Sequence, residues 1–228
     1  MACRSQTEIV DCRLCDRLTE YRERVAEEKV RRFRHLEYWG RPVPSLGPAS
    51  ARLLVVGLAP AAHGGNRTGR MFTGDRSGDW LYRALHRFGF ANQPQSTDRR
   101  DGLRLIDCYI TAAVHCAPPD NKPSPDEYLQ CRPYLMEELQ QLRRVRAVVL
   151  LGQIAFRSYL AARAELGKPN PHPLPAFKHS GTTELSEGVL MVSSYHPSQQ
   201  NTQTGRLTEP MFDEVFRKAR GKLEGLPR

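Results

Sequence analysis

Hydrophobic positions along the chain form two kinds of pattern, short apolar runs and longer helix-period segments. Segments rich in apolar residues occupy 53–56, 103–115, 147–152 and 189–195, and each predicts a strand. Between them, apolar residues recur at helical spacing in 18–38, 77–89, 124–144, 153–166 and 208–223. This alternation predicts a three-layer α/β/α sandwich with a central, mainly parallel four-stranded sheet. We expect one domain over residues 1–228, entered through an N-terminal arm, residues 1–50.

Local signals mark where several of these elements begin and end. Ser77 is the predicted N-cap of the helix after the first strand, and Gly89 its predicted stop. The helix of 124–144 begins at Ser124 or Asp126. Residues 167–183 are rich in proline, glycine and histidine, so they predict a second long loop.

Polar loops follow three of the predicted strands, at 57–78, 116–125 and 196–206. Because ligands bind beyond the carboxyl ends of parallel strands, we expect Asp75, Asn121 and His196 to meet around Phe72. An amide can pair with the edge of a planar ring, and an imidazole can stabilise negative charge on a departing oxygen. A carboxylate can orient a water molecule or balance a cationic sugar.

Each of these residues also has a purely structural explanation. Asp75 is placed to cap a helix, and His196 precedes a proline in a turn. Asn121 is a turn former and Phe72 a core candidate. The basic residues beside the loops fit either phosphate contacts or solvated charges: Arg67, Arg70, Lys122 and Arg206. The sequence alone leaves both explanations open.

Composition changes the picture through charge. The chain has 34 Lys and Arg residues against 25 Asp and Glu, a formal net charge of +9. This balance favours a polyanionic partner such as nucleic acid, with a soluble basic enzyme as the alternative. No apolar run approaches the roughly 20 residues of a membrane helix, and the N-terminus has no apolar signal region. We therefore expect a cytoplasmic protein without a membrane partner.

Four of the six cysteines form a candidate metal site. Cys12 and Cys15 make a C-x-x-C motif, and Cys116 and Cys131 flank a proline-rich loop and the start of a helix. Disulfides are not expected in the cytoplasm, and four thiolates suit a structural zinc ion or an iron–sulfur cluster. Spacing does not decide between them, and four separate thiols are the third possibility. Cys108, within a strand, is a core candidate.

Three motifs, together with the cysteine pattern, resemble family 5 uracil-DNA glycosylases. They read GLAPAAHGGNRTGRMFTGD at 57–75, CAPPDNKP at 116–123 and HPSQQNTQTGR at 196–206. The resemblance implies a [4Fe–4S] cluster on Cys12, Cys15, Cys116 and Cys131. It also implies base excision repair of double-stranded DNA in a prokaryotic cytoplasm, as a nucleoid-associated activity of a monomer. The implied reaction is monofunctional: hydrolysis of the N-glycosidic bond of flipped-out uracil and other deaminated bases, leaving an abasic site.

The same resemblance implies a role for each site residue. Phe72 would stack on the base, and backbone amides at Leu58 and Ala59 would contact a base carbonyl. Asp75 would be the acidic catalyst, Asn121 would position base or water, and His196 would hold the developing negative charge. The remaining expected contacts are to DNA, from Asn66, Arg67, Lys122 and Arg206.

Alanine occupies three positions where many relatives in the superfamily carry polar side chains: Asp, Asn or Glu at the first, and a uracil-reading Asn at the other two. The three alanines are Ala59, Ala112 and Ala113. Fewer hydrogen bonds dedicated to uracil imply a looser pocket, so we expect hypoxanthine and 5-substituted uracils as further substrates.

Two other functions fit parts of the pattern. One is a non-catalytic iron–sulfur protein that binds damaged DNA, and the other is hydrolysis of a free nucleotide or nucleoside. The pairing of Asp75 with His196 favours catalysis, because a pure binding protein needs neither group.

Overall fold

A single five-stranded sheet forms the centre of the fold. The structure is a computed structural model that describes residues 9–224. The strands, in the spatial order β2-β1-β3-β5-β4, are β1 (Leu53–Gly57), β2 (Cys108–Ala112), β3 (Ala147–Leu151), β4 (Gly181–Glu184) and β5 (Leu190–Ser194). β1 pairs in parallel with β2 and β3, and β3 pairs in parallel with β5. The carboxyl ends of these four strands therefore share one edge, as the mainly parallel prediction requires.

The prediction of four strands is wrong by one. β4 overlaps the predicted 167–183 loop and pairs antiparallel with β5 at the edge of the sheet. Its side chains alternate between partly exposed and exposed positions, so no apolar run marks it in the sequence. The predicted 103–115 strand is also shorter in the structure, because only the five residues of β2 pair with β1.

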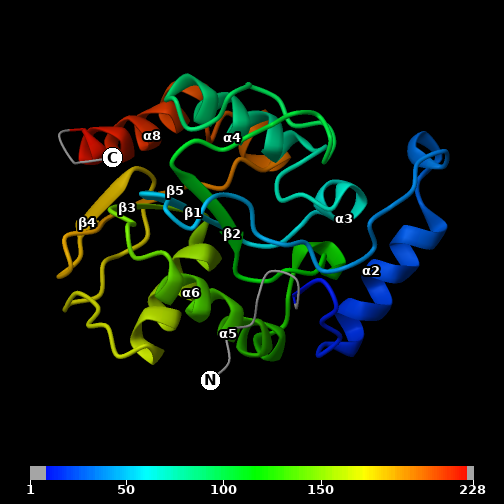
Figure 1. Cartoon of the computed structure of the whole chain (residues 1–228), viewed down its shortest axis with the longest axis horizontal. Coiled ribbons are helices and arrows are strands. Elements are labelled where there is room, and N and C mark those ends of the chain that lie inside the picture. Colours follow the sequence, from blue (N-terminus) through cyan, green and yellow to red (C-terminus); the bar gives the residue numbers. More distant parts are fainter. Residues whose placement is uncertain (1–8, 225–228) are drawn as a thin grey trace.

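Helices cover both faces of the sheet, as Figure 1 shows. They are α4 (Arg76–Arg87) and α8 (Glu209–Leu223) on one face, and α5 (Pro125–Gln141) and α6 (Gln153–Glu165) on the other. Leu53 and Val55 of β1 pack into the core under α4 and α8, whereas Leu54 and Val56 pack towards α5 and α6. Ser124 is the N-cap of α5, in a capping box with Glu127. Within residues 9–224, no helix has both the length and the apolarity needed to span a bilayer.

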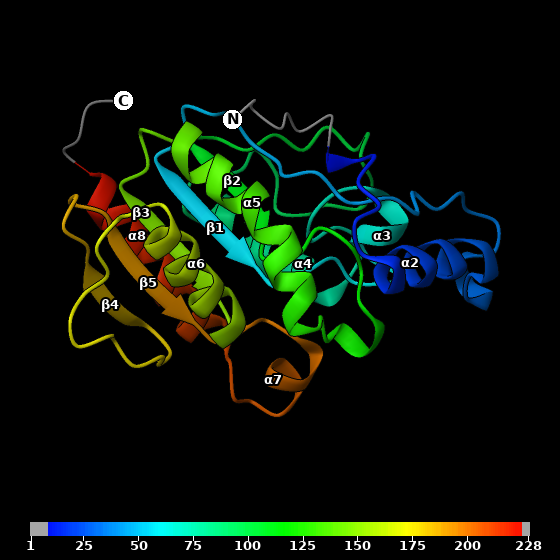
Figure 2. The same ribbon diagram turned by 90° about the horizontal axis from the view of Figure 1, so that it is seen from below.

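The N-terminal arm stands beside the β2 side of the sheet. It contains α2 (Asp16–Glu28) and the 3₁₀ turn η1 (Arg31–Phe33), next to α3 (Gly65–Thr68). Figure 2 shows α2, α3 and α7 (Gln199–Gln203) beyond the arrowheads of the parallel strands. The predicted 18–38 helix is thus broken, because Lys29 adopts a left-handed φ of 54° and ends α2.

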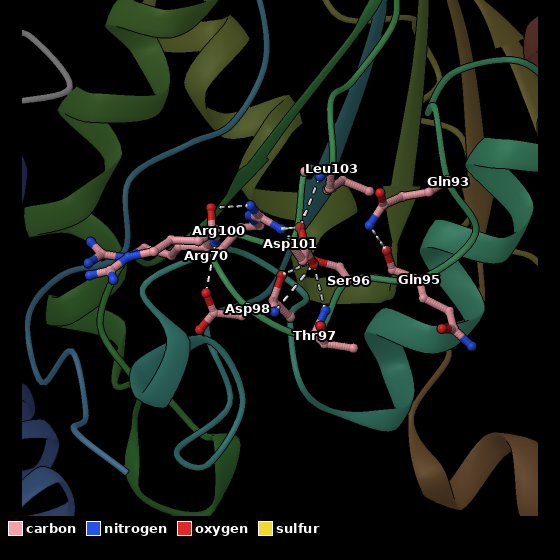
Figure 3. Close-up of polar contacts among 12 residues, drawn as sticks. Arg70, Gln93, Gln95, Ser96, Thr97, Asp98, Arg100, Asp101 and Leu103 are labelled. Carbon is pink, nitrogen blue, oxygen red and sulfur yellow. Dashed lines mark hydrogen bonds and ion pairs between the residues drawn. The ribbon is translucent and has the colours of Figure 1, made fainter.

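A buried ion pair braces the loop that follows β1. Arg70 contacts Asp101 at 2.7 Å, and their side chains are only 8% and 10% exposed. Arg70 also donates to the hydroxyl of Ser96, and Asp101 accepts the backbone N–H groups of Thr97 and Leu103 (Figure 3). Although burial opposes it, these donors lower the pKa of Asp101. The guanidinium of Arg70 therefore has a structural role, and it is not exposed for a contact with phosphate.

We expect Asp101→Asn to lower the free energy of unfolding by about 1–3 kcal/mol at neutral pH, because Arg70 loses its counter-charge and an NH2 donor replaces one of the two acceptor oxygens. The wild-type carboxylate has a lowered pKa in the folded state. Its contribution is therefore fully present above the unfolded-state pKa of about 3.9 and is lost as the pH falls through the folded-state pKa. Urea unfolding at a series of pH values measures the difference between variant and wild type, which should shrink in acid.

Asp98→Asn is the matched control, because Asp98 lies in the same loop, is exposed and accepts the backbone N–H of Arg100. It should change stability by no more than about 0.5 kcal/mol. Equal stability of wild type and Asp101→Asn at neutral pH would refute the bracing role.

Candidate functional site

The carboxyl edge of the sheet borders a cavity of about 680 Å³, which we call the Asp75 cavity. Its volume lies within the range of small-molecule sites, about 300–1,000 Å³. The loop after β1, the turn η2 (Pro119–Asn121), α7 and the N-terminal arm form its walls. The lining residues are Tyr21, Arg32, Phe33, Ala61, Ala62, His63, Gly64, Gly74, Asp75, Arg76, Asp79, Pro118, Asp120, Asn121 and Gln199.

Asp75 caps α4, in place of the predicted Ser77. Its Oδ1 accepts the backbone N–H of Gly78 at 2.9 Å, and its Oδ2 faces Gly64. A β-carbon at Gly64 would lie 2.1 Å from that oxygen, so only glycine permits the approach. Burial raises the pKa of Asp75, and the Gly78 hydrogen bond opposes the rise. The helix cap uses Oδ1 of Asp75 and leaves Oδ2 for chemistry. A structural role as the N-cap is therefore compatible with a catalytic role.

Phe72 connects the loop after β1 to the loop after β5. Its ring lies over the end of β1, where a β-carbon at Gly57 would be 2.6 Å from the ring carbon Cζ. The same ring stacks on His196, with 6.1 Å between ring centroids and 29° between planes. Phe72 has a φ of 53°, a strained conformation for a bulky residue and one that is common at functional sites.

His196 lines a second cavity of about 330 Å³, together with Leu58, Asn201 and Arg206. Burial lowers the pKa of His196 to about 4, so the imidazole is neutral at physiological pH. It can act there as an N–H donor and not as a cation. Asn201 donates to the His196 carbonyl oxygen at 2.8 Å, which ties α7 to this turn.

The three predicted catalytic residues therefore line two different cavities, not the single one that the sequence predicted. Asp75 and Asn121 share the first, and His196 lines the second. α7 borders both, through Gln199 in the first and Asn201 in the second. The Phe72–His196 stack links the two groups of residues. Asn121 itself is exposed and has a left-handed φ of 55°, which asparagine tolerates better than most residues.

The predicted DNA contacts fall into two classes. Lys122 and Arg206 are exposed, as such contacts require. Asn66 is fully buried, and its amide donates to the Arg22 carbonyl oxygen, which does not fit the predicted DNA contact. Arg67 is partly buried and braces the loop, since it donates to the His63 and Gly74 carbonyl oxygens. Leu58 and Ala59 continue the chain beyond β1, and the Leu58 carbonyl accepts the N–H of Val114.

The four predicted ligand cysteines line one cavity, shared with Leu18, His115 and Tyr134. Burial raises the pKa of Cys116 to about 12; the nearby thiols of Cys12 and Cys15 add to the rise, and Arg22 opposes it. Burial also raises the pKa of Cys131, against a hydrogen bond from the His115 backbone. Cys108 is buried in β2, outside this cavity.

The described residues do not form a preassembled site for a metal ion. Within residues 9–224, no three or more His, Cys, Asp or Glu side chains converge on a point that could hold a metal ion. A structural zinc site requires four ligands within about 2.3 Å of one atom. The four thiols line one cavity of about 20 Å³, which we call the thiol hollow.

The sequence analysis missed the contribution of the N-terminal arm to the Asp75 cavity. Tyr21, Arg32 and Phe33 line one wall, next to His63, which hydrogen-bonds Tyr38 at 3.1 Å. Burial lowers the pKa of His63, with Arg32 and Arg67 adding to the effect. The signal was the run KVRRFRH at 29–35, which mixes basic and aromatic residues but was assigned to a helix face.

Comparison with known proteins gives a consistent family. A family model described as the uracil DNA glycosylase superfamily matches residues 44–220. The type-5 uracil-DNA glycosylase of Mycobacterium tuberculosis is 53% identical over 94% of this chain and 79% of its own length. That of Thermus thermophilus is 50% identical over 94% of both chains. A type-4 uracil-DNA glycosylase of Pyrobaculum aerophilum is 33% identical over 57% of this chain and 60% of its own.

We expect the imidazole of His196 to titrate near pH 4 in heteronuclear NMR, with its signal assigned by its absence in His196→Asn. Because this pKa lies below the unfolded value of about 6.5, the unfolded chain binds more protons between the two values. The contribution of His196 to stability is thus complete above pH 6.5 and declines as the pH falls towards 4. Titration close to 6.5 would show that the ring is not desolvated.

Proposed function

The chain belongs to the uracil-DNA glycosylase superfamily and is a type-5 uracil-DNA glycosylase, and we propose that it removes uracil and other deaminated bases from double-stranded DNA. The proposed reaction is monofunctional: water cleaves the N-glycosidic bond of a flipped-out nucleotide and leaves an abasic site. We place this activity in the cytoplasm, on nucleoid DNA, with a monomer as the active species.

The position of Asp75 is the observation that carries this proposal. Its Oδ1 is fixed by the start of α4, and the carboxylate lines a cavity that also receives Asn121. Glycosidic cleavage builds positive charge on the sugar, which a fixed carboxylate stabilises directly or by activating the attacking water. Asn121 positions the base or that water.

Phe72 and His196 provide the binding site for the base. Their centroids are 6.1 Å apart, less than the about 7 Å that a base stacked between two rings at contact distance would require. The base therefore stacks on Phe72 after His196 has turned towards the base edge. There the neutral imidazole donates a hydrogen bond to the carbonyl oxygen on which negative charge develops, with amides at Leu58 and Ala59 as further donors.

The breadth of substrates follows from the side chains at the strand ends. Ala59, Ala112 and Ala113 provide no hydrogen-bonding side chain, so the pocket leaves few polar groups unpaired when uracil is replaced. Hypoxanthine and 5-substituted uracils are therefore further substrates. Mispaired bases unstack at lower cost, which favours uracil opposite guanine.

The proposed cofactor is a [4Fe–4S] cluster held by Cys12, Cys15, Cys116 and Cys131. The four thiols line one cavity, and, besides burial, the neighbouring thiols of Cys116, Cys12 and Cys15 raise the pKa of Cys131, which supports a shared site. A metal centre would keep all four deprotonated. When bound, it would supply a covalent link between the arm and the loop after β2, since the hydrolysis needs no redox step.

Asp75→Ala should reduce single-turnover excision from a fluorescent uracil-containing duplex by about 100- to 10,000-fold, the range of a lost general base. Its affinity for abasic duplex should stay close to that of wild type. Asp79→Ala is the matched control, because Asp79 lies on the same helix and lines the same cavity. Excision by Asp75→Ala at most of the wild-type rate would exclude the assigned role.

The wild type in this assay also tests the reaction itself. The labelled strand should break only after alkali, and hypoxanthine-containing duplex should be processed as well. Strand cleavage without alkali would exclude monofunctional chemistry. DNA binding with no excision of any base would favour the non-catalytic alternative.

Cys116→Ala should yield protein without the brown colour, iron and acid-labile sulfide expected of wild type, and with a lower melting temperature. Cys108→Ala is the control, because Cys108 is also buried but lies in β2 away from the thiol hollow. It should keep the iron content of wild type. Colourless wild-type protein after anaerobic purification, or zinc in place of iron, would refute the assigned cofactor.

A further inference from the structure

The outer end of the N-terminal arm carries concentrated positive charge. Residues 29–35, KVRRFRH, contain one lysine and three arginines and no carboxylate. Arg31, Arg32 and Arg34 are exposed, and none of them forms an ion pair with a carboxylate in the part of the chain that the structure describes. Figures 1 and 2 show the turn that follows α2 standing clear of the sheet and its helices.

The Asp75 cavity beside this turn is acidic. Asp75, Asp79 and Asp120 line it, against the guanidinium groups of Arg32 and Arg76. Three carboxylates would repel a phosphodiester chain approaching the cavity unless positive charge lay along its rim. If this cavity acts on DNA, basic side chains next to the carboxylates are needed to attract the phosphodiester backbone.

Aromatic and arginine side chains hold the turn against the loop that carries Asp75. Two guanidinium groups contact the Phe33 ring, that of Arg32 at 4.6 Å and that of Arg67 at 4.1 Å from its centroid. Arg67 also donates to the carbonyl oxygen of Gly74, the residue before Asp75. The position of Arg32 is thereby linked to that of the carboxylate through one continuous set of contacts.

Backbone hydrogen bonds fix the return of the arm to the body. Trp39 donates to the Arg67 carbonyl oxygen at 2.9 Å, and Gly40 donates to that of Asn66 at 3.0 Å. The side chain of Arg22 meets the Gly40 carbonyl oxygen at 2.6 Å. These contacts fix the backbone where the arm returns to the body, which lowers the ordering cost of binding DNA on the turn.

We propose that Arg31, Arg32 and Arg34 form a phosphate clamp that binds the DNA backbone beside the extruded nucleotide. This inference rests on the proposed function and adds the surface on which the substrate strand is held. Arginine suits the task, because its planar guanidinium binds phosphate oxygens in pairs and never loses its charge. The contacts are to the backbone, so they confer affinity without base preference.

The experiment compares three triple variants of the full chain on a fluorescent duplex with one uncleavable abasic analogue. Arg31→Gln/Arg32→Gln/Arg34→Gln removes the clamp, and the corresponding Arg→Lys variant keeps its charge. Arg143→Gln/Arg144→Gln/Lys168→Gln is the matched control. It also removes three exposed charges, but near the amino ends of the strands, away from the Asp75 cavity.

Each phosphate contact contributes about 0.9 to the slope of log Kd against log salt concentration. Loss of the three arginine contacts should therefore lower the slope of the Gln clamp variant by roughly two to three. Its Kd should rise about tenfold or more at moderate salt. The control should keep the wild-type slope, and the Lys variant should recover most of it. Melting temperatures establish that each variant is folded.

A wild-type slope in the Gln clamp variant would overturn the inference. So would an equal loss in the control, which would indicate diffuse attraction by net charge, or an equal loss in the Lys variant, which would indicate a structural role for the turn. Uracil excision by wild type is measured separately. Its absence would refute the proposed function while leaving the comparison of slopes decisive for the clamp.

Discussion

The site depends on how closely the loop after β1 packs against the end of its own strand. Two glycines make that contact possible, because a β-carbon at Gly57 would meet the ring of Phe72, and one at Gly64 would meet the carboxylate of Asp75. Phe72 accepts a left-handed backbone to occupy this position. The strain is offset by a buried setting, and it places a flat apolar ring and a carboxylate three residues apart at the mouth of the sheet. Base stacking and glycosidic chemistry both require that proximity.

Charge is separated within the molecule, although its net value is +9. Asp75, Asp79 and Asp120 line the Asp75 cavity together with Arg32, whereas Arg31 and Arg34, on either side of Arg32 and Phe33 in the sequence, are exposed. Other arginines serve the fold, as the buried pair of Arg70 with Asp101 and the hydrogen bonds of Arg67 to the loop show. The basic composition therefore indicated a polyanionic partner, but it did not indicate which basic side chains are free to contact that partner. Burial and pairing decide that, and neither can be read from composition.

The elements that the sequence predicted well are those with a local physical signature. β1 and β3 have continuous apolar runs, and Ser124 with Glu127 forms the capping box that begins α5. β4 was missed because an edge strand of alternating exposed residues has no such run. The N-cap of α4 is Asp75 and not Ser77, since the tight turn at Phe72 starts the helix earlier. The cavity wall formed by the arm depends on packing between segments distant in sequence, for which one sequence carries no local signal.

Arg22 connects the cavity lined by the four thiols to the N-terminal arm. Arg22 is 2% exposed, and its guanidinium contacts the carbonyl oxygens of Gly40 and Cys12. Its carboxylate partner, Glu23, is 3.6 Å away and 42% exposed, so within residues 9–224 Arg22 is not paired with a buried carboxylate. The proposed cluster would provide a buried counter-charge, because thiolates bound to it carry negative charge beside Arg22, which already opposes the rise in the pKa of Cys116. A metal centre with no redox task would then be retained because it fixes the arm that forms one wall of the Asp75 cavity.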